Sequence, residues 1–286
     1  MNRAVLLVVA GVVSVQVGAA FAKGLFDEVS PSTLVWLRLA FSTVVLLLVA
    51  RPRLRGRSRR DWLVVLGFGL ALGTMNWAIY QSFARIPLGI AVTIEFVGPL
   101  GVALAGSRRA RDLLWVGLAG LGVVLLGVER ADLDPLGVGF ALLAGAAWAA
   151  YILLSQATGA RWQGVDGLAL ASLVAVLPLT PYVLLTGGEA LVDPRILALG
   201  LAIGLLSSVV PYTCELVALR TLPSSTFGIL MSLEPAAAAL AAIVVLGELL
   251  EPTQWAAVAC VVVAVAGATA SSARAARPLP AAPAPD

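Results

Sequence analysis

The chain has 286 residues, of which 60% are apolar and 12% are charged, and its formal net charge is +3. A soluble domain usually carries about 25% charged residues, and a water-soluble fold of this size has too little interior for so much apolar surface. The absence of histidine removes the commonest general base and metal ligand. The expected partner is therefore a lipid bilayer, and no metal or nucleic acid is expected.

Apolar runs of about 20 residues are long enough to cross the hydrocarbon core of a bilayer as helices. We predict about ten of them, separated by charged or turn-forming residues, and therefore an all-α membrane protein. The expected spans are residues 4–22, 33–50, 62–83, 88–106, 112–128, 136–155, 168–186, 196–218, 224–247 and 253–271. The first run is longer than the usual apolar region of a signal peptide, so we expect it to be retained.

The basic residues predict the orientation of these spans. An even number of spans puts both termini on one side of the membrane, together with the arginines of residues 51–60 and 108–111. The opposite side would hold only Lys23, Arg85, Arg130 and Arg195. Basic loops stay in the cytoplasm, so we expect a multi-pass protein of the cytoplasmic (inner) membrane with both termini cytoplasmic. We expect residues 273–286, rich in alanine and proline, to be a disordered tail.

The chain also repeats itself. A shift of 136 residues places Pro87 on Pro223 and Pro99 on Pro235, which predicts a first repeat at 1–135 and a second at 136–272. Five spans is an odd number, so the two repeats would cross the membrane in opposite directions. Inverted repeats are typical of transporters that expose one site to each side in turn. The alternative is a duplication that only built a bundle.

Several motifs resemble a known family. The run from Gly228 to Pro235, followed by Gly247-Glu248 and Trp255, resembles the EamA repeat of the drug/metabolite transporter superfamily, and Arg38 matches an arginine of that family. In the first half, Met75–Tyr80, Ile86–Val92, Glu95–Leu100 and Ser107–Arg109 are similar to the threonine and homoserine exporter branch.

This resemblance implies an EamA-like transporter fold of ten transmembrane helices. It also implies export of amino acids such as threonine or homoserine, or of related small metabolites, with coupling to protons and no cofactor. The first half departs from the family pattern, because Gly106-Ser107 stands where a second Gly-Glu ending would fall. That ending is therefore not expected to act twice in a symmetric mechanism.

Ionisable residues inside a span cost several kcal/mol unless they are paired or wet, so each is a functional candidate. Arg38 and Glu95 have similar predicted depths and opposite charges. They form either a structural ion pair or a site in which Arg38 binds a substrate carboxylate and Glu95 binds an ammonium group or a proton. Glu234 precedes Pro235, which is expected to kink the helix. This carboxyl either exchanges a proton or stays neutral and hydrogen-bonded.

Polar and aromatic residues supply further candidates. Asn76, Tyr80 and Phe83 share one helical face, and Trp148 and Tyr151 form another pair. Tyr212 is the repeat equivalent of Asn76, and Gln16 lies deep in the first span. These residues either line an apolar cavity with a few polar groups or serve ordinary helix packing.

Other functions make different demands on the sequence. Export of drugs or hydrophobic cations would favour more buried acidic residues, and nucleotide-sugar exchange would favour more buried basic ones. An intramembrane enzyme would need a nucleophile with its base, or a metal cluster, and neither pattern occurs. A non-transporting scaffold would leave the embedded charges unexplained. No phosphate-binding loop for ATP is present. We therefore expect a secondary active transporter rather than an enzyme.

Overall fold

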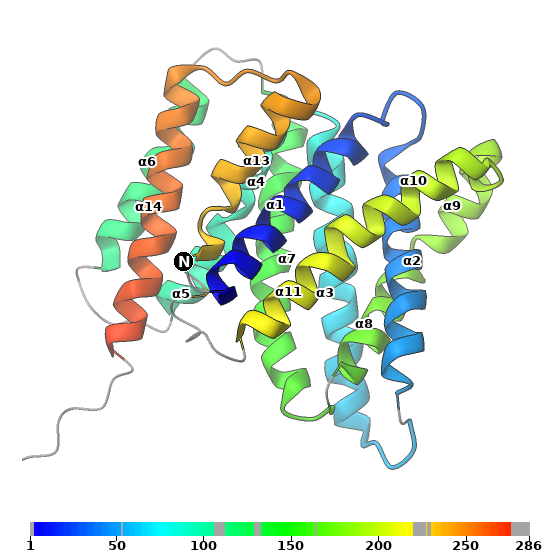
Figure 1. Ribbon diagram of the computed structural model, residues 1–286. Helices are drawn as coiled ribbons and strands as arrows, with labels where there is room; N and C mark the ends of the chain where they lie inside the picture. Colours follow the sequence, from blue (N-terminus) through cyan, green and yellow to red (C-terminus); the bar gives the residue numbers. More distant parts are fainter. Residues whose placement is uncertain are drawn as a thin grey trace, which may run out of the picture.

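The chain folds into a bundle of helices joined by short loops (Figure 1). The computed structural model describes residues 3–52, 54–105, 112–128, 133–163, 165–219, 227 and 230–275. The first half holds α1 (Arg3–Lys23), α2 (Pro31–Ala50), α3 (Arg59–Phe83), α4 (Leu88–Glu95), α5 (Val97–Ala105) and α6 (Asp112–Val128). The second half holds α7 (Pro135–Gly159), α8 (Asp166–Val176), α9 (Thr180–Thr186), the 3-10 turn η1 (Gly188–Leu191), α10 (Pro194–Gly204), the π-turn η2 (Leu205–Val209), α11 (Val210–Leu219), α13 (Glu234–Ala241), the π-turn η3 (Ala242–Leu246) and α14 (Pro252–Ala275).

The described helices have the lengths and surfaces of a membrane protein. By length and composition, α1, α2, α3 and α7 can each cross a bilayer, and the bent pair α8–α9 adds a fifth candidate. Large apolar side chains such as Leu48, Leu114 and Leu185 point outward and are more than 60% exposed. Outward-facing leucines of this kind suit contact with lipid rather than water. The prediction of an all-α membrane protein is therefore confirmed.

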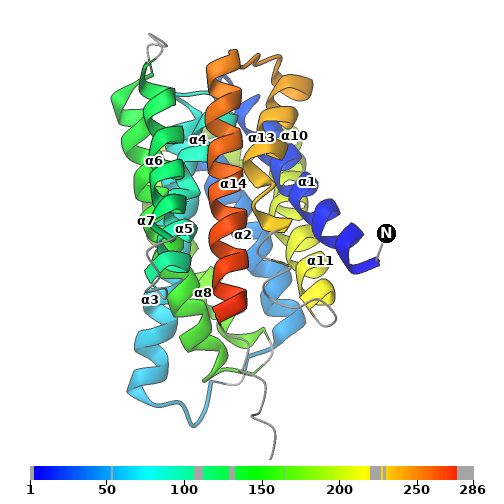
Figure 2. The same ribbon diagram turned by 90° about the vertical axis from the view of Figure 1, so that its left-hand side faces the viewer.

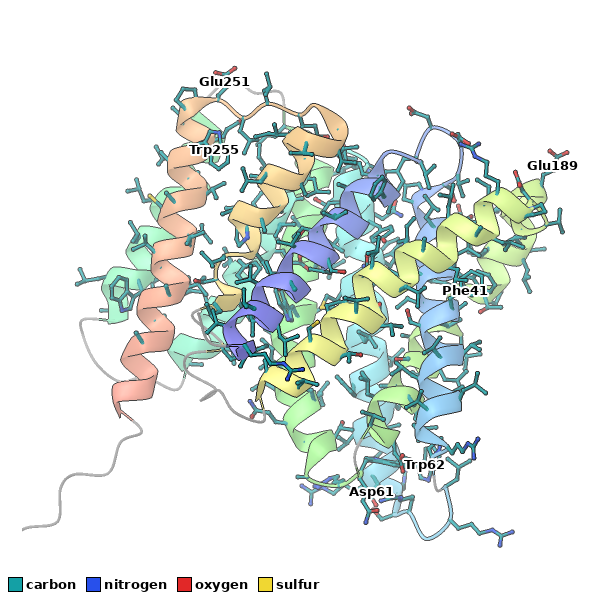
Figure 3. The ribbon with its side chains drawn as sticks, viewed as in Figure 1. Phe41, Asp61, Trp62, Glu189, Glu251 and Trp255 are labelled. Carbon is teal, nitrogen blue, oxygen red and sulfur yellow. The ribbon has the colours of Figure 1, made fainter. Side chains whose placement is uncertain are left out.

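The helices of the bundle pack together in several sets of neighbours. Helix α3 packs along α7 and α8, whereas α1 packs along α11 and α13. Helices α6 and α14 lie side by side at one edge of the bundle, which faces the viewer in Figure 2. Figure 3 shows Glu251 at one end of the bundle and Asp61 at the other. We call these the Glu251 end and the Asp61 end.

Two of the expected spans are broken at prolines. The range 88–106 breaks at Phe96, between α4 and α5, and the range 224–247 contains a turn at Ser232 and Leu233 before α13 begins. Prolines explain both breaks, because Pro99 and Pro235 lack the N–H that would bond the carbonyl four residues earlier. The breaks are separated by the same 136 residues that align the prolines. The kink expected beside Glu234 is therefore present, and the first break had not been expected.

The expected span 168–186 is also interrupted. Its two halves, α8 and α9, are bent by 44°, in a segment that contains Pro178 and Pro181. The Thr180 hydroxyl donates a hydrogen bond to the carbonyl of Val176, and Trp36 Nε1 on α2 donates to the Thr180 oxygen over 2.9 Å. These side chains satisfy polar groups at the bend and so make it a fixed feature of the helix.

The π-turn η2 interrupts the helix formed by α10 and α11. A π-turn disturbs the regular ladder of backbone hydrogen bonds, so nearby carbonyl groups become available to side chains. Ser14 on α1 donates to the carbonyl of Leu206 over 2.7 Å, and Arg38 on α2 donates to that of Ser207 over 3.0 Å. The turn thus gives α1 and α2 a common set of backbone acceptors.

Glycines bring the backbone of α7 against the break between α4 and α5. A Cβ atom at Gly145 would lie 2.6 Å from the carbonyl oxygen of Glu95, and a Cβ atom at Gly98 would overlap the carbonyl oxygen of Gly145. Only residues without a side chain allow this approach. The position of the Glu95 backbone therefore depends on two glycines.

We predict that Gly98→Ala lowers the stability of the folded protein by roughly 1–3 kcal/mol, because the added methyl group must push α5 away from α7. The measurement is the midpoint of thermal unfolding in detergent. Gly101→Ala is the matched control on the same helix, since a Cβ atom there meets nothing within 4 Å. Equal midpoints for the two variants would contradict the close approach.

Candidate functional site

Arg38 is held inside the bundle by the π-turn. Its side chain is 8% exposed, and it donates from Nη2 to the Ser207 carbonyl and from Nε to Ser208 Oγ, at 3.0 and 3.5 Å. The guanidinium group also lies 5.7 Å from the centre of the Tyr80 ring. These contacts fix the direction of a buried charge while using only part of its five N–H donors.

Glu95 is the last residue of α4 and is also 8% exposed. Within the described part of the chain, its carboxyl group has neither a hydrogen bond nor an ion pair within 4.0 Å. Arg38 acts on it electrostatically from a greater distance. The direct Arg38–Glu95 ion pair, one of the two alternatives from the sequence, is therefore not formed in this structure, because Arg38 is bonded to η2 instead.

Gln16 and Glu234 meet between α1 and α13. Gln16 Nε2 donates to Glu234 Oε2 over 3.3 Å, and both side chains are buried. Glu234 lies in the first turn of α13, directly after the helix break, where a carboxylate is favoured by the helix dipole. The Gln16 Oε1 atom is buried without a partner among the described residues. The contact thus joins two candidates that are 218 residues apart in the chain.

The shared face of α3 is buried as expected. Asn76, Tyr80 and Phe83 are at most 3% exposed. Asn76 Nδ2 donates to the carbonyl of Leu72 in its own helix, which is the arrangement of ordinary helix packing. Tyr80 differs, because its hydroxyl group is buried and has no hydrogen-bond partner in the described chain.

The remaining aromatic candidates lie against other rings. Trp148 packs on Phe96 with ring centres 4.7 Å apart, and Tyr151 packs on Phe68 at 5.1 Å. The first contact places Trp148 beside the helix break that follows Glu95. The side chain of Tyr212, the other aromatic candidate, lies outside the described residues.

A cluster at the Glu251 end joins three helix ends and was not predicted as part of a site. Glu248 follows the left-handed residue Gly247, forms an ion pair with Lys23 at the end of α1, and accepts a hydrogen bond from the backbone N–H of Leu88 over 3.0 Å. Lys23 also donates to the carbonyl of Ile86 over 2.8 Å. The Gly-Glu ending was the only sequence signal, and it did not reveal these partners.

Two further ion pairs lie near the same end. Arg195 at the start of α10 forms two hydrogen bonds to the Glu28 carboxylate, the shorter of 2.7 Å. Arg85 lies 3.6 Å from Asp134. Both pairs are more exposed than the Lys23–Glu248 pair, so they are expected to contribute less to stability.

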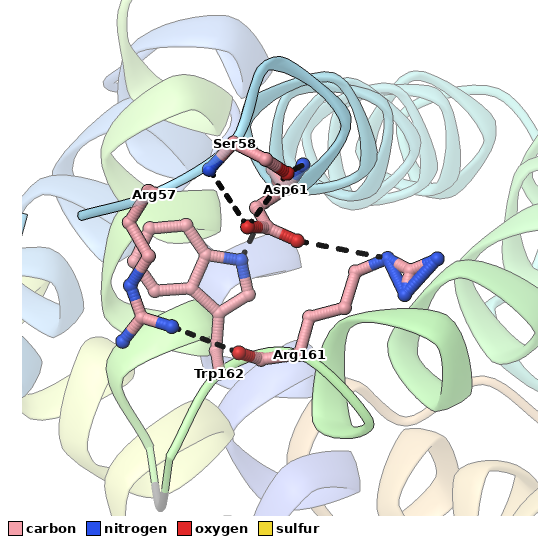
Figure 4. Close-up of polar contacts among 5 residues, drawn as sticks. All are labelled: Arg57, Ser58, Asp61, Arg161 and Trp162. Carbon is pink, nitrogen blue, oxygen red and sulfur yellow. Dashed lines mark hydrogen bonds and ion pairs between the residues drawn. The ribbon is translucent and has the colours of Figure 1, made fainter.

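Another cluster closes the Asp61 end, where α3 meets the loop between α7 and α8 (Figure 4). Ser58 and Asp61 form a capping box at the start of α3. The Arg57 guanidinium lies 4.2 Å from the centre of the Trp162 ring and donates to the carbonyl of Arg161 over 2.9 Å. Arg161 Nε lies 3.9 Å from Asp61 Oδ1. These contacts tie together segments about 100 residues apart in the chain.

A hollow of about 180 Å³ lies between α3 and α8, and its wall is mainly apolar. Gly69, Gly73, Trp77 and Val174 are among its lining residues. None of the predicted binding residues lines this hollow, so it does not correspond to the cavity expected from the sequence.

The apolar helices are long enough to span a membrane, and they enclose a few buried charges. These features define an integral membrane protein with polar groups in its interior. The model of the EamA-like transporter family matches the chain twice, over residues 2–128 and 135–270. The chain therefore belongs to the EamA-like transporter family.

Individual proteins agree with this assignment. The threonine/homoserine exporter RhtA of Escherichia coli strain K12 is 42% identical over 268 residues, which cover 93% of this chain and 90% of the exporter. The exporter of the same name from Salmonella typhimurium strain LT2 gives the same identity and coverage. The uncharacterized transporter YwfM of Bacillus subtilis strain 168 is 28% identical over 211 residues, which cover 68% of this chain and 70% of YwfM. These relatives are transporters rather than enzymes.

One solved crystal structure shares the fold. The alignment covers 96% of this chain and 99% of the chain in the crystal structure, with a TM-score of 0.65 and 18% sequence identity. At this identity the similarity concerns the fold alone.

We predict that Lys23 and Glu248 stabilise each other more than an exposed ion pair does. The variants Lys23→Met and Glu248→Gln, singly and together, should give a coupling energy of about 1 kcal/mol or more in a double-mutant cycle of thermal unfolding. The pair Glu28 and Arg195, which is 46% and 64% exposed, serves as the control and should give less than about 1 kcal/mol. A smaller coupling for Lys23 and Glu248 than for this control would show that the cluster does not hold the helix ends together.

Proposed function

We propose that the protein exports threonine, homoserine or closely related amino acids from the cell as a secondary active transporter. The observation that carries this proposal is 42% identity over 93% of the chain to a threonine/homoserine exporter. The interior fits such a substrate, since a free amino acid carries one carboxylate and one ammonium group. Arg38 and Glu95 offer a buried charge of the opposite sign for each.

The proposed architecture has ten transmembrane helices in two inverted repeats, at residues 1–135 and 136–272. Two observations support this division: the family model matches the chain twice, and the two proline breaks are separated by the same 136 residues that align the repeats. Both termini would lie in the cytoplasm of a cell whose inner membrane holds the protein. Residues 273–275 of the predicted tail belong to α14, and its remainder, residues 276–286, lies outside the described residues. The arginines of residues 51–60 support this orientation.

Within this architecture, Arg38 binds the carboxylate of the amino acid. The guanidinium group of arginine matches a carboxylate with two parallel hydrogen bonds, and the contacts to η2 leave donors free for them. Glu95 binds the ammonium group, which is supported by the absence of a competing partner for its carboxyl group among the described residues. Tyr80 lies against Arg38, while Trp148 lies against Phe96 beside Glu95.

Glu234 is the proposed proton carrier. It lies at a helix break, is buried, and accepts a hydrogen bond from Gln16. An amide can stay hydrogen-bonded to a carboxyl group in both protonation states, because it offers both donors and an acceptor. The unpartnered Gln16 Oε1 supplies that acceptor. Asn76, Tyr151 and Tyr212 complete the proposed walls of the pathway.

Transport can be tested with purified protein in proteoliposomes, using threonine, homoserine and a lipophilic cation such as tetraphenylphosphonium. For exchange of substrate against protons, an acidic lumen should accelerate uptake of both amino acids and should leave the cation unaffected. Arg38→Gln should raise the KM for threonine at least about tenfold, because a charge-assisted pair is lost. Uptake of the cation above that of protein-free liposomes, with uptake of neither amino acid, would refute the proposed substrate class.

The proton-carrying role of Glu234 has a separate test. Glu234→Gln should retain exchange of labelled for unlabelled threonine across the membrane but should lose the acceleration by an acidic lumen, since an amide does not carry a proton. Glu189→Gln, a change at an exposed residue of η1, is the matched control and should behave as the unaltered protein. If the Glu234→Gln protein kept its full dependence on the gradient, another group would carry the proton.

A further inference from the structure

The Tyr80 hydroxyl group is buried inside the bundle without a hydrogen-bond partner. Tyr80 is 0% exposed, and its hydroxyl group forms no hydrogen bond with any described atom. Leaving a buried hydroxyl group unbonded costs about 1–3 kcal/mol. Such a group therefore often forms its hydrogen bond with a ligand or a water molecule.

The neighbours of Tyr80 explain why the protein itself does not satisfy this group. The rings of Phe26 and Phe83 lie 6.0 and 5.8 Å from the Tyr80 ring, and neither offers a hydrogen-bonding atom. The third neighbour is Arg38, whose guanidinium group lies over the ring at 5.7 Å. Arginine only donates hydrogen bonds, and in this structure Arg38 donates from Nε and Nη2 to Ser208 and Ser207 rather than to Tyr80. The described contacts of the Tyr80 ring are thus with two apolar rings and one buried positive charge.

Tyr80 is the best placed of the unpartnered hydroxyl groups near Arg38. Ser207 also has an unbonded, buried Oγ atom. That atom lies against α1, where even a Cβ atom at Gly18 would overlap it, so the protein backbone occupies the adjacent space. The Thr43 hydroxyl group is unbonded too, but Arg38 makes no described contact with Thr43.

We propose that the Tyr80 hydroxyl group binds the side-chain hydroxyl of the transported amino acid and so makes the site selective for hydroxylated amino acids. This proposal rests on the proposed function, in which Arg38 binds the carboxylate of the same molecule. The carboxylate and the side-chain hydroxyl of threonine or homoserine are only a few bonds apart. A short zwitterion held by Arg38 can therefore reach the ring beside it.

The Tyr80 hydroxyl group would make the site selective by disfavouring substrates that lack a side-chain hydroxyl. A substrate hydroxyl can both donate to and accept from the Tyr80 oxygen, so it replaces the missing hydrogen bond. A methyl group of the same size would leave the Tyr80 hydroxyl buried and unbonded. Sites built to bond a substrate hydroxyl reject analogues that lack it far more strongly than apolar pockets reject an extra methylene group.

The test compares isosteric pairs of substrates, threonine with valine and homoserine with norvaline, in proteoliposomes. The unaltered protein should transport the hydroxylated member with a kcat/KM at least about tenfold higher. In Tyr80→Phe, which removes one oxygen atom, this preference should fall by about tenfold, mainly through a higher KM for threonine. Tyr182→Phe is the matched control, because Tyr182 is 52% exposed on α9, and it should keep the original preference.

The outcomes separate this proposal from the proposed function. Transport of threonine with an unchanged threonine-to-valine ratio in Tyr80→Phe overturns the role of Tyr80 and leaves the exporter assignment intact. Transport of neither amino acid by the unaltered protein overturns the exporter assignment itself. If Tyr80→Phe yields no folded protein, the test is competition between valine and labelled threonine for transport by the unaltered protein. Valine that inhibits threonine transport as strongly as unlabelled threonine overturns the proposal, and inhibition at least about tenfold weaker supports it.

Discussion

The contact between Arg38 and the π-turn η2 is the interaction on which the interior of this protein depends. A guanidinium charge inside a membrane protein needs acceptors close at hand. A regular α-helix offers few, since its carbonyl groups are already bonded within the helix. The π-turn is followed by Pro211, which has no N–H to bond the Ser207 carbonyl four residues earlier, and Arg38 bonds to that carbonyl instead. One irregular turn therefore makes it possible to keep a permanent positive charge between α2 and the helix formed by α10 and α11.

The buried acidic residues also lie beside interruptions of a helix. Glu95 precedes a break caused by Pro99, and Glu234 follows a break before Pro235. Helix ends present backbone dipoles that are absent from the middle of a helix. The first carboxyl group lies at the C-terminal end of α4, where the dipole opposes a negative charge, and the second lies at the N-terminal end of α13, where it favours one. The two breaks are thus equivalent in sequence but differ in the electrostatic environment that they give to a carboxylate.

The sequence predicts the parts of this fold that depend on local chemistry. The apolar runs gave the ranges of α1, α2, α3 and α7, and Pro235 indicated the break beside Glu234. The partner of Arg38 was not predicted: Pro211 indicates that the carbonyl of Ser207 lacks its helical donor, but no local pattern shows which side chain bonds to it. The contacts of Glu248 with Lys23 and Leu88 were missed for another reason. They join three helix ends far apart in the chain, and only the packing of the whole bundle brings them together.

The ion pairs at the Glu251 end change the surface charge that lipids meet. Lys23, Arg85 and Arg195 are each paired with a carboxylate, so their charges are largely neutralised within the protein. Arg51, Arg55, Arg59 and Arg60, toward the Asp61 end, form no ion pair with any described residue. Clustered arginines of this kind attract anionic lipid headgroups when they lie at a bilayer surface. Among the described residues, the basic charge left without an ion pair is therefore greater toward the Asp61 end of the bundle than at the Glu251 end.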